Sequence, residues 1–511
     1  MFENQPKGLF ALALANTGER FGYYTMLAVF VLFLQENFGM TASQAGDVYA
    51  TFLAFVYFLP FVGGILADKF GYGKMVTIGI VTMFFGYLLM AWPLGTDNPA
   101  LYAMYGALAL ISVGTGLFKG NLQVMVGNLY DDPKYAHKRD AAFSLFYMAI
   151  NLGSLFAPSA ASAMKNYALE AGWVTTTGEA YHFAFAVACV SLVFSILVYM
   201  FTRSTFKHVE NGAVKAQGSN AAAAAVEENP ADTKSRIVAL CLVFAVVIFF
   251  WMAFHQNGLT LTYFAKEFTT LTATEGLQSM LFNVWNLVLV IIGVYAGFSI
   301  FQSKTTKGKT LSAVAVVAVV GVLVIQYLNA GERAISAEMF QQFNPFYVVA
   351  LTPVSMALFG WLASRGKEPS APRKIALGML VAGLGFAVIA FASMGLLTPN
   401  QQAAALAAGE SVATVSPNWL ITTYLVLTFA ELLLSPMGIS FVSKVAPAKY
   451  KGMMMGGWFV ATAAGNYLTK VGSSFWGDLP LWGVWTIFIV CCLLSAVFMF
   501  SVMKKLEAVA K

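Results

Sequence analysis

Long apolar runs alternate with short polar stretches along the whole chain. An apolar helix needs about 20 residues to cross a bilayer. Fourteen runs in this chain reach a spanning length. Spans of this length and spacing predict an all-α polytopic membrane protein with 14 transmembrane helices. The predicted spans lie near residues 9–35, 47–67, 75–94, 100–129, 141–164, 181–202, 237–264, 280–301, 310–329, 344–364, 373–397, 418–443, 453–476 and 481–503.

A polar, alanine-rich stretch at residues 203–236 interrupts this alternation and separates six predicted spans from eight. We expect an N-terminal six-helix bundle over residues 1–202, a cytoplasmic linker over 203–236, and a C-terminal bundle over 237–511. The C-terminal part then holds two extra helices near residues 280–329. These two carry no intramembrane charge, so we expect them to pack at the periphery.

Composition and charge placement support the membrane assignment. Of the 511 residues, 59% are hydrophobic and 11% are charged. Soluble domains carry about 25% charged residues, roughly twice this share. If the N-terminus is cytoplasmic, most of the 30 lysines and arginines fall in cytoplasmic segments, which is the positive-inside pattern. We therefore expect a multi-pass membrane protein with both termini in the cytoplasm. The net charge of +6 then gives no reason to expect a nucleic-acid partner.

The first predicted span contains charged and polar residues. Asn16, Glu19, Arg20, Tyr23 and Tyr24 are spaced three, four, seven and eight residues apart, so they share one helix face. Full charges inside a bilayer are costly and must meet a partner or a wet cavity. Two interpretations stay open: a wall of a polar cavity, and a structural Glu–Arg pair that joins two helices.

One loop resembles a known signature. Residues 63–74 read Gly-Gly-Ile-Leu-Ala-Asp-Lys-Phe-Gly-Tyr-Gly-Lys, which looks like the loop motif of the major facilitator superfamily, and a weaker echo stands at residues 360–365. The resemblance implies that superfamily's fold, two six-helix halves related by repetition.

More specific motifs narrow the family. Residues 19–24 read Glu-Arg-Phe-Gly-Tyr-Tyr, residues 116–119 read Gly-Leu-Phe-Lys, and residues 143–154 are centred on Asn151. These resemble the first-, fourth- and fifth-helix signatures of the proton-dependent oligopeptide transporters. The corresponding C-terminal landmarks are Phe250-Trp251 with Gln256, Asn344-Pro345, Glu431 through Ser435-Pro436, and Gly457-Trp458 with Gly465-Asn466.

The resemblance implies a site for a small zwitterionic peptide, and the residue types suit one. Arg20 and Lys119 supply cations for a carboxylate, and Glu431 supplies an anion for an amine. Lys119 and Glu431 also form the expected inner gate. The remaining substrate-binding candidates are the amides, aromatic walls and hydroxyl of Asn151, Asn344, Tyr23, Tyr57, Trp251, Trp458 and Ser435. Each aromatic taken alone is better explained by ordinary packing.

The chain departs from the family pattern at three positions. Asn16 stands where the family has the first glutamate of its first-helix motif, His255 replaces a glutamate beside Gln256, and Leu27 replaces the arginine that pairs with it. The candidates for proton coupling are Glu19, Glu431 and His255. We expect Glu19 to carry the coupled proton. His255 either tunes the outer gate or is a neutral histidine bonded to a backbone carbonyl.

The resemblance, together with these residues, predicts proton-coupled symport of di- and tripeptides into the cell by alternating access, and it implies the plasma membrane of a bacterium. The alternative is a transporter of the same fold for a non-peptide substrate such as nitrate, a drug or an amino-acid conjugate. The four histidines and four cysteines show no metal-ligand or disulfide spacing, so we expect no metal, no enzyme activity and no cofactor besides the coupling proton. We expect a monomer, although the sequence leaves the oligomeric state open.

Overall fold

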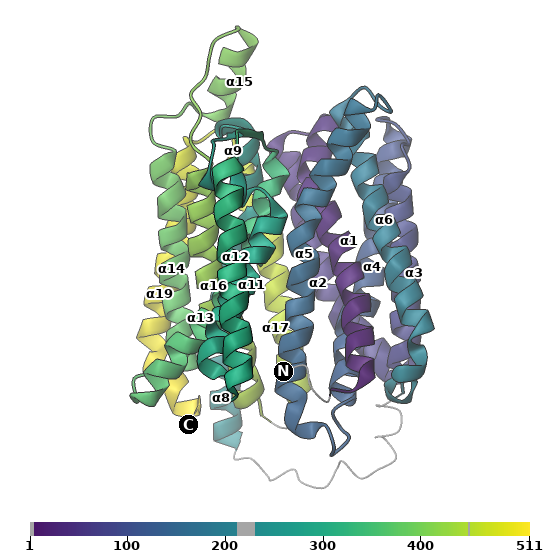
Figure 1. Cartoon of the computed structure of the whole chain (residues 1–511), viewed down its shortest axis with the longest axis vertical. Helices are drawn as coiled ribbons and strands as arrows, with labels where there is room; N and C mark the ends of the chain where they lie inside the picture. The colour runs from purple at the N-terminus through teal and green to yellow at the C-terminus, as the bar shows by residue number, and fades with distance from the viewer. Residues whose placement is uncertain (1–4, 212–229, 448–449, 511) are drawn as a thin grey trace. The chain divides into compact units, whose positions relative to one another are not determined.

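The computed structural model describes residues 5–211, 230–447 and 450–510 and is almost entirely helical (Figure 1). Within these residues, 12 helical stretches are long and apolar enough to cross a membrane. The all-α membrane fold predicted from the sequence is therefore confirmed. The predicted spans near residues 9–35 and 453–476 overlap α1 (Lys7–Phe38) and α17 (Lys451–Leu468), which are not among the 12, so the count of fourteen stays a prediction.

The chain divides into two compact units. The first comprises Met1–His255, Gly438–Ser474 and Val502–Lys511, and the second comprises Gln256–Met437 and Phe475–Ser501. The expected division into bundles over residues 1–202 and 237–511 stays a prediction, and residues 212–229 of the expected linker lie outside the described residues.

The elements of the first unit are α1, α2 (Ala42–Phe70), α3 (Tyr72–Ala91), α4 (Asn98–Asn128), η1 (Ala136–Lys138), α5 (Arg139–Glu170), α6 (Thr177–Phe201), η2 (Arg203–Thr205), η3 (Lys207–Val209), α8 (Pro230–Phe254), α17 and α18 (Lys470–Ser474). The elements of the second are η4 (His255–Gly258) except for its first residue, α9 (Thr260–Phe268), β1 (Thr272–Ala273), α10 (Leu277–Leu281), α11 (Val284–Gln302), α12 (Thr306–Asn329), β2 (Arg333–Ala334), η5 (Ala337–Gln342), α13 (Phe343–Ser364), α14 (Ala371–Ala392) and α15 (Pro399–Ala407). Most of α16 (Asn418–Val445) and α19 (Leu481–Ala510) also belongs to the second unit.

Local chemistry sets the break between the first two helices. Gly39 adopts φ 63°, a left-handed conformation that ends α1 at low steric cost. Two residues later Thr41 starts α2 through a capping box, in which its side chain accepts from the Gln44 backbone and the Gln44 side chain accepts from the Thr41 backbone.

In the first unit, α1 packs along both α5 and α6 and lies between them (Figure 1). Small residues permit this close approach. A Cβ at Gly153 of α5 would lie 2.7 Å from the Thr17 carbonyl oxygen, and one at Gly18 of α1 would lie 3.0 Å from the Phe194 ring. The polar turn of α1 is therefore held against two neighbouring helices.

In the second unit, α11 and α12 form a helical hairpin over the region where two extra spans are expected. Val319 is the one buried residue of α12. A short antiparallel ladder pairs Thr272 with Ala334 and Ala273 with Arg333, which ties the segment after α12 to the segment before α10.

Candidate functional site

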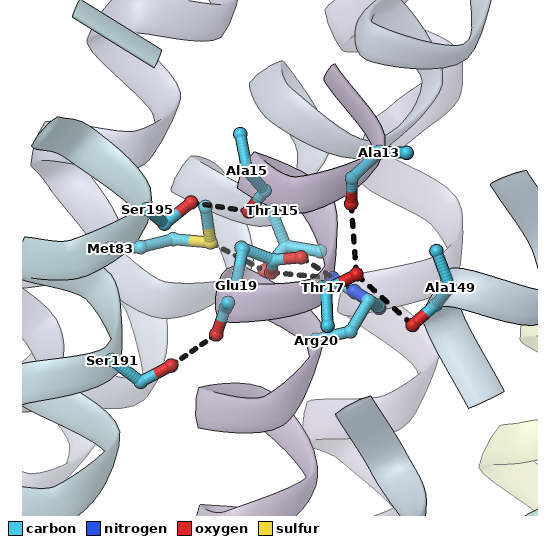
Figure 2. A network of polar contacts seen from close by, with 11 residues as sticks. Ala13, Ala15, Thr17, Glu19, Arg20, Met83, Thr115, Ala149, Ser191 and Ser195 are labelled. Carbon is cyan, nitrogen blue, oxygen red and sulfur yellow. Dashed lines mark hydrogen bonds and ion pairs between the residues drawn. The ribbon is translucent and has the colours of Figure 1, made fainter. Parts of the chain in front are cut away.

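The charged turn of α1 contains a buried ion pair. Arg20 donates from Nε to Glu19 Oε2 at 2.5 Å and from Nη2 to Glu19 Oε1 at 2.6 Å (Figure 2). The Glu19 side chain is 0% exposed and the Arg20 side chain 3%. This bidentate geometry satisfies both charges within one helix, so the pair does not join two helices.

Polar side chains of neighbouring helices bond the backbone of this turn (Figure 2). From α6, Ser191 donates to the Gly18 carbonyl and Ser195 to the Ala15 carbonyl. Thr17 of α1 itself donates to the Ala149 carbonyl of α5 at 3.2 Å. Sequence inspection missed these residues; their signal is the small hydroxyl side chains four residues apart on an apolar helix.

Aromatic and amide groups extend the polar face of α1. The Arg20 guanidinium lies 4.7 Å from the centre of the Tyr23 ring, a cation–π contact that adds to the ion pair. The Tyr23 hydroxyl and Asn16 Nδ2 are both buried, and neither has a hydrogen-bond partner among the described residues. Buried polar groups in proteins are normally satisfied, so these two atoms are exceptions on this face of α1.

A second cluster in the same unit contains the histidine that departs from the family pattern. Lys119 Nζ of α4 lies 4.1 Å from the centre of the Tyr57 ring of α2. The Tyr57 and His255 rings contact each other edge-on, with their centres 5.8 Å apart. His255 also lies 5.3 Å from the Trp251 ring, and its Nδ1 is 3.3 Å from the Trp251 carbonyl oxygen. A carbonyl accepts only, so His255 donates from Nδ1 and its Nε2 is left as the second polar atom.

The second unit holds the predicted anion. Asn344 Nδ2, in the first turn of α13, donates to Glu431 Oε2 of α16 at 2.9 Å and to Thr428 Oγ1 at 3.1 Å. Ser435 follows Glu431 by four residues on α16 and so lies on the same helix face. Thr428 was not a candidate from sequence, although its position three residues before Glu431 places it beside that carboxylate.

Two further candidates are engaged in local contacts of the first unit. Asn151 Nδ2 donates to the Tyr147 carbonyl one turn earlier on α5, at 3.0 Å. Trp458 is 5% exposed and packs its ring against Gly438. The site candidates thus gather into two clusters in the first unit and one in the second. The proposed inner gate of Lys119 and Glu431 draws on both units and stays a prediction.

Comparison with known proteins places this arrangement in a family. The profile of the POT family matches residues 73–226 and 322–481. The chain belongs to the POT family. The resemblance inferred from the motifs is therefore confirmed, and with it a transporter fold of the major facilitator type. This family and fold are those of transporters and not of enzymes.

Curated relatives cover nearly the whole of this POT-family chain. An uncharacterised transporter of Bacillus subtilis (strain 168), YclF, is 29% identical over 94% of this chain and 90% of its own length. Dipeptide and tripeptide permease A of Erwinia pyrifoliae is 28% identical over 90% of this chain and 83% of its own length.

Solved structures give the same fold. A crystal structure of the peptide transporter POT in complex with sulfate superposes with a TM-score of 0.73 at 23% identity, covering 100% of this chain and 96% of the other. A POT family transporter in complex with 5-aminolevulinic acid gives a TM-score of 0.72 at 20% identity, over 100% and 98% of the two chains. At these sequence identities, the comparison with solved structures shows a shared fold and nothing further.

Proposed function

We propose that this protein imports di- and tripeptides together with protons across the bacterial plasma membrane, by alternating access. The observation that carries the proposal is the half-buried Glu431 carboxylate held by Asn344, because a fixed anion in a membrane transporter suits a substrate with a positive group. The names of the dipeptide and tripeptide permeases among the relatives support the same substrate class.

The opposite end of a peptide is a carboxylate, and the first unit supplies a cation for it. Arg20 donates from Nε and Nη2 to the Glu19 carboxylate, so these two donors are already used. Lys119 rests against the Tyr57 ring and has no carboxylate within salt-bridge distance among the described ion pairs. Lys119 is therefore the first contact for the peptide carboxylate, and Arg20 becomes available when Glu19 is neutralised.

Proton coupling follows from the same pair. Protonation of Glu19 would remove the charge that Arg20 satisfies and free the guanidinium for the substrate, so that proton and peptide binding reinforce each other. A proton entering down about 100 mV gains about 2.3 kcal/mol, and each pH unit adds about 1.4 kcal/mol. His255 tunes the outer gate from its place between Tyr57 and Trp251.

The competing function is transport of a non-peptide substrate on the same fold. A simple anion such as nitrate has no group for Glu431, whereas an amino-acid conjugate presents both charges. Competition against labelled dialanine uptake by nitrate, free alanine and unlabelled tripeptide separates these classes. Competition by the tripeptide alone supports the proposal; competition by nitrate alone contradicts it.

The amine contact is tested with Glu431→Gln, which keeps the shape of the side chain and removes its charge. Free dialanine should lose affinity by at least about tenfold, since a charged hydrogen bond contributes about 1.5–3 kcal/mol. N-acetyl-dialanine, which lacks the ammonium, should lose much less. Equal losses for both peptides would contradict the contact.

A further inference from the structure

The hydrogen-bond inventory of Asn344 points to an additional positioning residue. An asparagine amide has two N–H donors on Nδ2 and one acceptor, Oδ1. Here Nδ2 serves two acceptors, Glu431 Oε2 at 2.9 Å and Thr428 Oγ1 at 3.1 Å. Both donors are therefore used, and Oδ1 is the remaining polar atom of the side chain.

The two acceptors fix different features of this amide. A carboxylate accepts only, so Glu431 determines that nitrogen and not oxygen faces α16. With this hydrogen bond alone, the Asn344 amide plane could still rotate about the line from Nδ2 to Glu431. The second hydrogen bond, to Thr428, prevents that rotation. Thr428 is itself 0% exposed. It stands three residues before Glu431, so the two side chains are neighbours on one face of α16.

We propose that Thr428 is a positioning residue that holds Asn344 with Oδ1 directed to the substrate, so that this end of the site offers hydrogen-bond acceptors only. Glu431 and Asn344 Oδ1 together then select a protonated primary amine, which donates three hydrogen bonds, over an acylated amine, which donates one. The inference rests on the peptide-transport function and adds the residue that sets amine selectivity.

The test compares Thr428→Val and Thr428→Ser in purified protein reconstituted into proteoliposomes. Valine keeps the shape and removes the hydroxyl, whereas serine keeps the hydroxyl. In Thr428→Val, KM for free dialanine should rise by about three- to tenfold, the range that one hydrogen bond supports, with kcat little changed. The inhibition constant of N-acetyl-dialanine should stay within about twofold of wild type, and Thr428→Ser should restore the free-peptide KM.

A matched control is available on the same helix. Thr423 is also 0% exposed, and its hydroxyl bonds the Trp419 carbonyl of its own helix at 2.8 Å. Thr423→Val removes the same atoms and should leave the ratio of free to acetylated affinity unchanged. Thermal midpoints of all variants report whether each is folded.

The outcomes separate the two levels of the proposal. If wild-type protein transports dialanine but Thr428→Val weakens both peptides equally, or Thr428→Ser does not restore affinity, Thr428 is a packing residue and the inference is wrong. If wild-type protein transports no peptide, the proposed function fails and the amine selectivity fails with it.

Discussion

At the scale of single residues, the proposed proton coupling depends on which charges are already paired. Glu19 and Arg20 neutralise each other with two short hydrogen bonds in a site from which water is excluded. Removing one partner of such a pair leaves an uncompensated buried charge, which is strongly unfavourable. A proton on Glu19 therefore changes the state of Arg20, and this is the property that coupling needs.

The prediction for Glu19 follows from that dependence. Glu19→Gln mimics the protonated carboxyl permanently, so peptide exchange should continue while accumulation driven by a pH gradient is lost. Counterflow of labelled dialanine and gradient-driven uptake, measured on the same vesicles, report the two activities separately. Loss of both activities, or retention of both, would contradict Glu19 as the coupling site.

His255 is the internal comparison for this assignment. Its Nδ1 bonds a backbone carbonyl and its ring lies among Tyr57, Trp251 and Phe254, an environment that suits a neutral imidazole. We expect His255→Gln to retain both counterflow and gradient-driven uptake. Uncoupling by this variant alone would transfer the role of proton carrier from Glu19 to His255.

Lys119 carries a second residue-scale prediction. Lys119→Ala removes the cation that faces Tyr57 and should reduce concentrative dialanine uptake to background, because the peptide carboxylate loses its ionic partner. Lys309→Ala is the matched control, since Lys309 is an exposed lysine near the start of α12. Accumulation by Lys119→Ala at the level of the control would remove Lys119 from the mechanism.

The sequence identifies ionisable site residues better than their orienting partners. Glu19 and Arg20 are conspicuous because charges are rare in apolar spans, and Asn344 belongs to a family landmark. Thr428 is not conspicuous, because a lone threonine is common in membrane helices. Its importance depends on where Asn344, 84 residues earlier, meets α16. The direct Glu19–Arg20 pairing also depends on side-chain rotamers that neighbouring positions do not determine.

At the scale of elements, contacts of its backbone with two neighbouring helices hold the polar turn of α1. Ser191 and Ser195 of α6 bond carbonyls on one side of α1, and Gly153 of α5 allows the backbones to approach on the other. Small residues at such crossings are typical of membrane helices, because close packing there replaces the hydrophobic drive of water.

Gly153→Val tests this crossing. A Cβ at Gly153 would lie 2.7 Å from the Thr17 carbonyl oxygen and 3.2 Å from the Phe21 nitrogen, both backbone atoms that cannot turn aside. We expect a loss of about 1–3 kcal/mol of stability, as for overpacked cores, seen as a lower thermal midpoint in detergent. Gly321→Val on α12 should be neutral, since nothing lies within 4 Å of a Cβ there. Equal midpoints for the two variants would show that the crossing tolerates a side chain.

Element boundaries show how far hydropathy alone can be used. Apolar runs predict most spans, but α1 and α17 both fall outside the 12 spans selected by length and hydropathy, and α1 bears the charged residues Glu19 and Arg20. Polar side chains lower the hydropathy of the helices that line a binding cavity. Hydropathy nevertheless identifies α4, α13 and α16, which bear Lys119, Asn344 and Glu431.

At the scale of the whole molecule, we propose that a peptide and a proton cross the membrane together. The anion Glu431 lies in the second unit, and the cation Lys119 and the Glu19–Arg20 pair lie in the first. Since the coupling pair and the carboxylate contact share a unit, protonation and substrate binding can influence each other without a long pathway.

The most direct measurement is uptake of labelled dialanine into proteoliposomes containing the purified protein, with and without an imposed inward proton gradient. The account predicts accumulation above the external concentration only when the gradient is present, and its collapse when a protonophore is added. Uptake that merely equilibrates and ignores the gradient, or an absence of dialanine uptake in vesicles that accumulate a different substrate, would contradict it.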